Sequence, residues 1–507
     1  MKIKSFTLAV AVAACAVIAC KQSEMKPQQG YIGPSDIVIT DGHMTPEVLL
    51  SLGRLSDPQL SPDGKTILYG VSYTSIEENR SVRNLVTIPV EGGEPTQLTM
   101  DGKSITSARW SKDGKSVWFL QGGKLYEAPY VSGKLRRRIL RADVPGGIDD
   151  YLLSPDESQM IYVKGVHSAV EVPSDTDPAL DKAKAYATED LMYRHWDHWR
   201  TEIAHSFVAS LGNGVVKEGM DILGEELFEL PNGPFPDIAD LAWSPDGRYI
   251  AYSCKKLTGK EYAFSTNTCI YIYCPLTGET SQVTFDGGYD THPVWSPDGG
   301  SLLWLSMERD GYEADKVRLM LGDVIYEEEG EGQSANPAVE NVRELTANFK
   351  YNVESPVWAA DSQSIYFAAL TEGIGAVYNI VPDANEIFRL TSENLWFDFG
   401  SPFGVQQDGT LLTTFMSMDF PIELVAVNDN AVRQITFEND HILSQLDKHE
   451  TEARMIKTID GQDMLTWVLY PPQFDPTKTY PAIEITLGGP QGTLSQDWSY
   501  RWNYLLM

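Results

Sequence analysis

The sequence predicts an all-β fold: a seven-bladed β-propeller, followed by the first strands of a second domain. The main observation is a repeated unit in which an apolar residue precedes Ser-Pro-Asp-Gly and alternating apolar residues follow. Clear copies are "DPQLSPDGKTILYGV" from Asp57, "DLAWSPDGRYIAYSC" from Asp240 and "HPVWSPDGGSLLWLS" from His292. The turn aspartates that mark the seven copies are Asp63, Asp113, Asp156, Asp246, Asp298, Asp361 and Asp408, the last two in worn units.

Each copy predicts a β-hairpin. Proline presets one turn dihedral, aspartate accepts hydrogen bonds from turn amides, and glycine permits a positive φ. The alternation of apolar residues on both sides makes the two arms strands. A second pair of strand-like segments follows each unit, as in "NLVTIPVEGGEPTQLT" from Asn84. Two hairpins per repeat make a four-stranded blade, and seven repeats make a seven-bladed propeller over residues 55–440.

The spacing of the repeats is uneven at one place. Successive turn aspartates are 50, 43, 90, 52, 63 and 47 residues apart. The interval of 90 residues, from Asp156 to Asp246, either conceals an eighth blade or carries an insertion. Residues 165–235 show no second turn signature, so we expect an insertion.

That insertion contains "ATEDLMYRHWDHWRTEIAHSF" (Ala187 to Phe207), with three histidines, His195, His198 and His205. A metal site is one interpretation, but no HExxH pattern accompanies these residues. We expect instead an amphipathic lid or packing segment at the mouth of the propeller, and neither a metal nor a cofactor. A second polar cluster, "MERDGYEADK" from Met307, either aims carboxylates at a ligand amine or caps a solvated turn.

The N-terminus predicts export. "MKIKSFTLAVAVAACAVIAC" has two lysines, a short apolar run and small residues before Cys20, which is typical of a signal peptide. "VIAC" is similar to a bacterial lipobox, so residues 1–20 are expected to be a lipoprotein signal peptide with lipidation at Cys20; an ordinary signal peptide is the alternative. Residues 21–54 then form a tether and a helical segment with Thr45 as N-cap. We expect a membrane-anchored lipoprotein of the bacterial periplasm or outer membrane.

The net charge and the cysteine spacing argue against a nucleic acid partner and against a cysteine metal site. The chain has 40 Lys and Arg against 71 Asp and Glu, a net charge of −31, which disfavours nucleic acid. Beyond the signal region the cysteines are Cys254, Cys269 and Cys274, without metal-ligand spacing. Cys254 ends one expected strand and Cys269 starts the next, so either a disulfide between them or two buried free thiols is expected.

The repeats end near Thr436, and residues 441–507 follow another pattern. "EARMIKTIDGQDMLTWVLYPPQF" from Glu452 predicts two strands around an Asp-Gly turn, and "YPAIEITLGGP" predicts a third strand before a glycine turn. This order of three strands and Gly-Gly-Pro opens an α/β-hydrolase sheet. In such enzymes the loop after the third strand supplies a backbone N–H to the oxyanion hole, which makes Gly488 and Gly489 the candidates here.

Taken together, the propeller of Ser-Pro-Asp-Gly blades and the segment "KTIDGQDMLTWVLYPPQFDPTKTYPAIEITLGGPQ" resemble the prolyl oligopeptidase family of serine peptidases, in its branch of dipeptidyl and acylaminoacyl peptidases. "DLMYRHWDHW", "SMERDGYEADK" and "SYRWN" fit the same branch. The resemblance implies a propeller that gates access of short peptides to an active site. It also suggests Arg194, Glu308 and Arg309, in family-like loops, as substrate contacts.

The resemblance further implies a Ser, Asp and His triad, with the Ser on a G-x-S-x-G turn. This sequence contains no G-x-S-x-G, and all eight histidines lie at or before His449, upstream of the hydrolase strands. We therefore expect an incomplete α/β-hydrolase domain, truncated before the triad, and a chain that is catalytically incomplete. The alternative is a non-enzymatic propeller lipoprotein that binds peptide, glycan or a protein partner.

Overall fold

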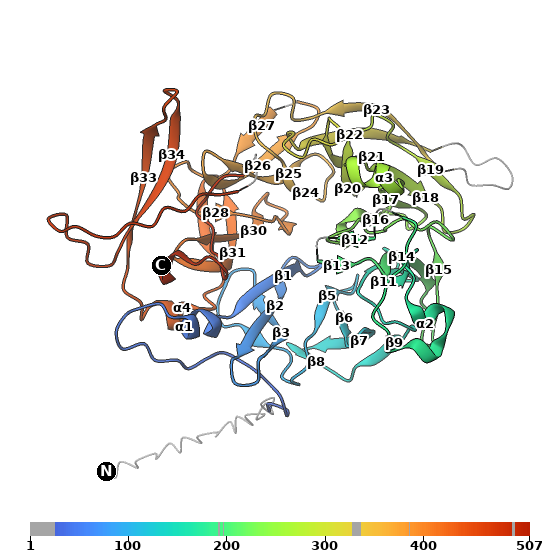
Figure 1. Cartoon of the computed structure of the whole chain (residues 1–507), viewed down its shortest axis with the longest axis horizontal. Helices are drawn as coiled ribbons and strands as arrows, with labels where there is room; N and C mark the ends of the chain where they lie inside the picture. The colour runs from blue at the N-terminus through green and yellow to red at the C-terminus, as the bar shows by residue number, and fades with distance from the viewer. Residues whose placement is uncertain (1–25, 191–192, 196, 327–335, 385, 489–491) are drawn as a thin grey trace, which may run out of the picture.

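The computed structural model describes residues 26–190, 193–195, 197–326, 336–384, 386–488 and 492–507. The expected signal peptide, Cys20 and Gly489 lie outside the described residues. Within them, seven small antiparallel sheets follow one another around a ring, and each sheet is built from neighbouring strands of the chain, with a two-stranded hairpin inserted in the third (Figure 1). The fold is the predicted seven-bladed β-propeller.

The blades contain four or five strands each. Blades 1 to 3 comprise β1 (Arg54–Leu60), β2 (Thr66–Ser75), β3 (Arg80–Pro89) and β4 (Thr96–Gln97); β5 (Thr106–Trp110), β6 (Ser116–Gln121), β7 (Lys124–Val131), β8 (Lys134–Leu135) and β9 (Ile139–Ala142); and β10 (Asp150–Leu153), β11 (Gln159–His167), β14 (Glu202–Ser210) and β15 (Met220–Asp221). Blades 4 and 5 comprise β16 (Leu241–Trp243), β17 (Ile250–Cys254), β18 (Cys269–Tyr273) and β19 (Thr280–Gln282); and β20 (Tyr289–Trp295), β21 (Ser301–Met307), β22 (Arg318–Ile325) and β23 (Ala338–Glu344). Blades 6 and 7 comprise β24 (Glu354–Trp358), β25 (Ile365–Thr371), β26 (Ile374–Val381) and β27 (Glu386–Arg389); and β28 (Asp398–Phe399), β29 (Gly404–Val405), β30 (Leu411–Ser417), β31 (Phe420–Asn428) and β32 (Ala431–Gln434).

The repeated turns form as the sequence predicts. In blade 2, Ser111 Oγ donates to Asp113 Oδ1 at 2.9 Å, and the same oxygen accepts the Lys115 N–H at 3.0 Å. These bonds, led by the one from the Lys115 amide, lower the pKa of Asp113 to about 2. Gly114 has φ of 69°, which explains the glycine at this position. The same Ser–Asp bond recurs in blades 1, 3, 4 and 5 at 2.6–2.7 Å.

The hydrophobic core lies between the blades. Seven buried clusters each combine side chains from two neighbouring blades, such as Leu303 of blade 5 with Phe367 of blade 6. One of these clusters joins the two ends of the ring, with Ile88 of blade 1 against Leu424 of blade 7. In the described part of the chain no sheet combines strands from both ends, so the ring closes through side-chain packing and loop contacts.

The long interval between two turn aspartates is an insertion, as expected, and not an eighth blade. Residues 168–201 connect β11 to β14 within blade 3. They contain α2 (Pro173–Thr176) and the 3-10 helix η1 (Pro178–Leu180). They also contain a short hairpin of two strands with two residues each, β12 (Arg194–His195) and β13 (His198–Trp199). The histidine-rich stretch therefore forms a hairpin, in which His195 and His198 face each other across the strands.

Several short helices flank the sheets. α1 (Pro46–Ser51) precedes β1, and the Thr45 hydroxyl accepts the Val48 N–H at 3.3 Å, as its N-cap role predicts. The others are η2 (Ile238–Asp240), α3 (Gly259–Phe264), α4 (Asp440–Leu443) and η3 (Tyr504–Leu506). Among the described residues, none of the helices has both the length and the apolar character needed to cross a bilayer.

The expectation for the C-terminal segment is met only in part. β33 (Glu450–Lys457) and β34 (Asp463–Tyr470) form the predicted hairpin, which projects away from the ring (Figure 1). The predicted third strand is wrong for this structure: residues 480–488 pair with no strand, and Ile483 is 64% exposed. A strand needs a hydrogen-bonded neighbour, and the described residues offer this segment none.

Cys254 and Cys269 lie on adjacent strands, as the strand pattern predicts. Cys254 of β17 and Cys269 of β18 lie directly opposite each other. Both are buried free thiols in the structure, as is Cys274. Of the two alternatives for Cys254 and Cys269, the structure therefore agrees with free thiols and not with a disulfide. Burial raises the pKa of the Cys254 and Cys269 thiols, which keeps them protonated at neutral pH.

Candidate functional site

The propeller has two faces of different character. One, here called the turn face, carries the Ser-Pro-Asp-Gly turns between the first and second strands of each blade. The other, the loop face, carries the connections between second and third strands, because adjacent strands run antiparallel. The insertion 168–201, α3 and residues 308–317 are all such connections. α1 and α4 lie on the loop face too, since β1 starts there and β32 ends there.

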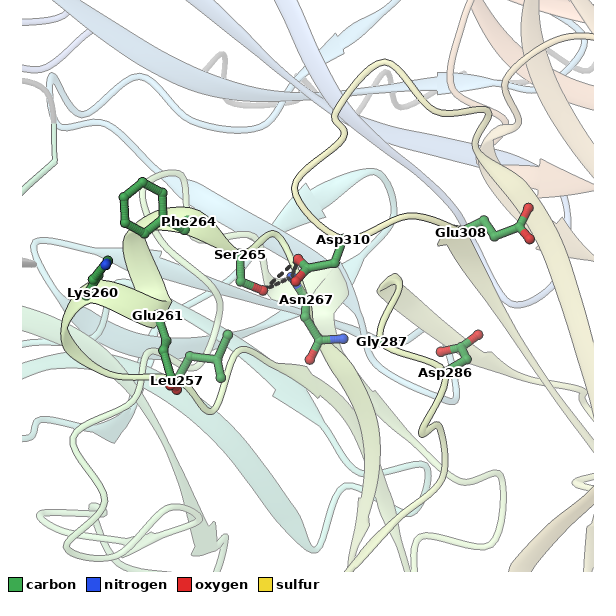
Figure 2. Close-up of a pocket in the computed structure, with 10 residues that line it drawn as sticks. All are labelled: Leu257, Lys260, Glu261, Phe264, Ser265, Asn267, Asp286, Gly287, Glu308 and Asp310. Atoms are coloured by element: carbon green, nitrogen blue, oxygen red, sulfur yellow. Dashed lines mark hydrogen bonds between the residues drawn. The ribbon is translucent and has the colours of Figure 1, made fainter.

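A cavity of about 900 Å³ opens on the loop face, over blades 4 and 5. Figure 2 shows α3 and the residues after it on one side, with Asp286 and Glu308 on the other. Its lining residues are Leu257, Lys260, Glu261, Phe264, Ser265, Asn267, Asp286, Gly287, Glu308 and Asp310. Four of them carry carboxylates and one carries an amine, so we call this cavity the acidic pocket. It suits a ligand with a positive charge.

Asp310 fixes one wall of the acidic pocket. Its Oδ1 accepts a hydrogen bond from Ser265 Oγ at 2.6 Å (Figure 2). The same oxygen accepts the Thr266 N–H at 2.8 Å. Burial alone would raise the pKa of Asp310, but these bonds hold it below its ordinary value. Asp310 is therefore ionised at neutral pH and ties the end of α3 to the loop after β21.

The structure separates the three predicted substrate contacts. Glu308 lines the acidic pocket, and its side chain is 74% exposed with an ion pair to Arg318 at 3.7 Å. Arg309 points elsewhere: it pairs with Asp315 at 2.8 Å and lies over the ring of Tyr312. Arg194 is exposed on the insertion hairpin. Gly488 lies in an exposed stretch of the C-terminal segment, away from any strand.

A buried carboxylate, Glu229, contacts α3, the helix that lines the acidic pocket. It is 5% exposed and contacts His195 Nε2 at 3.1 Å and Arg200 Nε at 3.1 Å, and it accepts the Tyr262 hydroxyl. Burial would raise the pKa of Glu229, but the bond from His195 and the charge of Arg200 outweigh it and lower that pKa to about 2. No local signal marks this residue in the sequence, because "GEELFELPNG" has the pattern of an ordinary acidic loop.

The three histidines of the insertion do not form a metal site. His195 pairs with Glu229, buried His205 pairs with Asp221 at 2.8 Å, and exposed His198 lies near Asp197. The described part of the chain contains no cluster of His, Cys, Asp or Glu suited to a metal ion.

The C-terminal segment also contacts the loop face, at blades 6 and 7. The rings of Trp467 and Trp396 meet at 5.4 Å, edge to face. Ser495 Oγ donates to Asp398 Oδ2 at 2.9 Å. Burial, partly offset by this bond, raises the pKa of Asp398 to about 6. The acidic pocket and the C-terminal segment therefore lie on the same face of the ring.

No protein-family model matches the chain. The chain is 40% identical over 480 residues to dipeptidyl-peptidase 5 of Porphyromonas gingivalis, covering 94% of this chain and 67% of that protein. It is 40% identical over 474 residues to dipeptidyl-peptidase 5 of Porphyromonas endodontalis, covering 92% and 65%. It thus spans about two thirds of the length of these relatives.

Among solved structures, the fold is similar to an acylaminoacyl peptidase in complex with Z-Gly-Gly-Phe-chloromethyl ketone. The TM-score is 0.67 at 16% identity, over 90% of this chain and 64% of that one. A structure from a study of two prolyl endopeptidases matches with a TM-score of 0.51 at 13% identity, over 85% and 57%. These likenesses agree with the propeller fold. Because it is 40% identical to the Porphyromonas proteins over more than 90% of its length, the chain belongs to the prolyl oligopeptidase family of peptidases, among relatives named dipeptidyl-peptidase 5.

Proposed function

We propose that this chain is the propeller part of an exported serine dipeptidyl- or oligopeptidase, and that it controls which peptides reach the catalytic site. The observation that carries the proposal is the acidic pocket on the loop face, the face that also holds the C-terminal segment. A peptide bound there lies on the side of the ring where a hydrolase domain would be attached. The relatives' names do not favour a non-enzymatic binding protein.

The ligand group that fits the acidic pocket is the α-ammonium of a short peptide. Glu261, Asp286, Glu308 and Asp310 supply negative charge, and a dipeptidyl peptidase has to recognise a free amino terminus. Phe264, 72% exposed at the pocket, offers an apolar surface to the first side chains. Charge and apolar contact together favour a peptide over a simple cation.

The C-terminal segment supports the hydrolase part of the proposal. The hairpin β33–β34 exposes apolar side chains, with Met455 63% and Ile459 fully exposed. Ile483 and Leu487 are also exposed in the stretch that follows. Exposed apolar surface of this extent is typical of an interface that another segment covers. We propose that the remaining strands and helices of an α/β-hydrolase domain cover it.

Catalysis is not expected from these 507 residues alone. The sequence contains no G-x-S-x-G motif and no histidine after His449, so it lacks the nucleophile and base of the family. Its own contribution to the chemistry would be a backbone N–H of Gly488 or Gly489 toward the oxyanion. Lipidation at Cys20 would hold the protein at a membrane of the bacterial periplasm, which is the localisation we propose.

Calorimetric titration with Ala-Ala-Ala and its N-acetylated form tests this function. We expect the free tripeptide to bind at least about tenfold more tightly, since acetylation removes the ammonium charge. Incubation of the same preparation with a fluorophosphonate probe should label nothing. Equal affinity for both tripeptides, absence of binding, or labelling of the mass-verified chain would each contradict the proposal.

A further inference from the structure

Glu229 joins two segments that lie far apart in the sequence, the insertion hairpin and α3. His195 belongs to β12 of the insertion hairpin, Arg200 follows β13, and Tyr262 lies on α3. All three contact the same carboxylate, which is buried on the loop between β15 and β16. Lys255 adds a further cation, with its Nζ 4.1 Å from the centre of the Tyr262 ring. One acidic side chain thus connects blades 3 and 4 above their sheets.

α3 is the wall between two cavities. Lys260, Glu261 and Phe264 line the acidic pocket. Gly259 and Tyr262 line a smaller cavity of about 130 Å³, which Arg200 also lines. Any displacement of α3 therefore changes the acidic pocket and the smaller cavity together.

The helix cannot hold this position by itself. α3 has six residues, and a helix of that length is unstable without tertiary contacts. At its C-terminal end it is tied by Asp310, through Ser265 and Thr266. In its middle, the bond from Tyr262 to Glu229 provides the corresponding contact to the insertion side.

From this arrangement we infer that Glu229 is a positioning residue, which holds α3 and the insertion hairpin together and so sets the shape of the acidic pocket. The three donors depend on one another, because a buried carboxylate is stable only while its hydrogen bonds are made. Loss of the charge at Glu229 therefore releases both segments. Only the identity of the ligand in the pocket rests on the proposed function.

Hydrogen–deuterium exchange of Glu229→Gln tests this inference. We expect exchange to become about tenfold faster in both the hairpin, residues 193–200, and α3, while strands β17 and β18 keep their protection. Glu226→Gln is the matched control, since Glu226 lies in the same loop but pairs with Lys256 near the surface. Faster exchange that is confined to residues 223–235, or absent, would overturn the inference.

Tyr262→Phe provides a milder variant in case Glu229→Gln does not fold. It keeps the ring and removes only the hydroxyl that Glu229 accepts, so the hairpin should loosen together with α3. Titration with Ala-Ala-Ala separates the two proposals. If the unmodified chain binds no tripeptide, the proposed function fails while the exchange pattern still decides the role of Glu229. If the unmodified chain binds and both variants bind equally well, the positioning role is wrong.

Discussion

The two faces of the propeller are built in opposite ways. On the turn face, five blades repeat one Ser–Asp hydrogen bond within a narrow range of distances, 2.6–2.9 Å. On the loop face, the connections share neither length nor sequence, and the acidic pocket and the Glu229 contacts are made from them. The repeated turns therefore serve folding, whereas the irregular loops, carried on a rigid ring, are free to serve recognition.

The largest expected effect comes from the core that supports both faces. Phe367→Ala removes a fully buried ring between blades 5 and 6, and should lower the free energy of unfolding by about 3–5 kcal/mol. Phe264→Ala also removes a phenylalanine ring, but this ring is exposed at the acidic pocket. It should change stability by less than about 0.5 kcal/mol and weaken binding of Ala-Ala-Ala. Urea denaturation and calorimetry measure the two outcomes, and similar stability losses would contradict the separation of roles.

Glu423 of β31 is a buried acid that makes the stability of the ring depend on pH. Burial, with the neighbouring Glu438, raises the pKa of Glu423 from 4.5 to about 8. Because the folded state holds this proton more tightly, the contribution is fully present below pH 4.5 and is lost as the pH rises to about 8. Each pKa unit corresponds to about 1.4 kcal/mol, so the loss should amount to a few kcal/mol.

Thermal unfolding of Glu423→Gln between pH 5 and pH 8 measures this effect. The glutamine stays neutral, so the variant should match the unmodified chain at pH 5 and exceed its Tm at pH 8. An identical pH dependence of the two proteins would show that Glu423 does not titrate in this range. The turns, whose aspartates are already ionised, should contribute nothing to the change over these pH values.

The smallest effect is expected from a single turn. Asp113→Ala removes the acceptor for Ser111 and the Lys115 amide, and should lower stability by about 1 kcal/mol. Asp156→Ala removes an equivalent acceptor in blade 3 and should give a similar loss. Neither variant should alter tripeptide affinity. A change in affinity from either one would mean that the turn face takes part in recognition.

The sequence predicts the turn face well because its determinants are local. Ser, Pro, Asp and Gly act within four residues, and the strands on either side follow from alternation alone. The number of blades and the N-cap at Thr45 follow in the same way. The opposition of Cys254 and Cys269 was predictable from strand ends, although the pattern left their bonding state open.

The loop face depends on contacts that no local pattern contains. Glu229 and Tyr262 are brought together across two blades, and neither residue stands out in its own stretch. Of the residues suggested as substrate contacts, Glu308 lines the acidic pocket, whereas its neighbour Arg309 pairs with Asp315. The expected strand at residues 480–488 shows the same limit, since strand formation requires a partner as well as a suitable sequence.

We propose that the loop face, at α3 and the acidic pocket, receives the amino terminus of a peptide. A hydrogen–deuterium exchange footprint of the chain with and without saturating Ala-Ala-Ala locates the bound peptide. We predict protection confined to residues 257–267 and 286–310, absent with the N-acetylated tripeptide and unchanged on the Ser-Pro-Asp-Gly turns. Protection on the turn face, or the same footprint from the acetylated tripeptide, would contradict the claim.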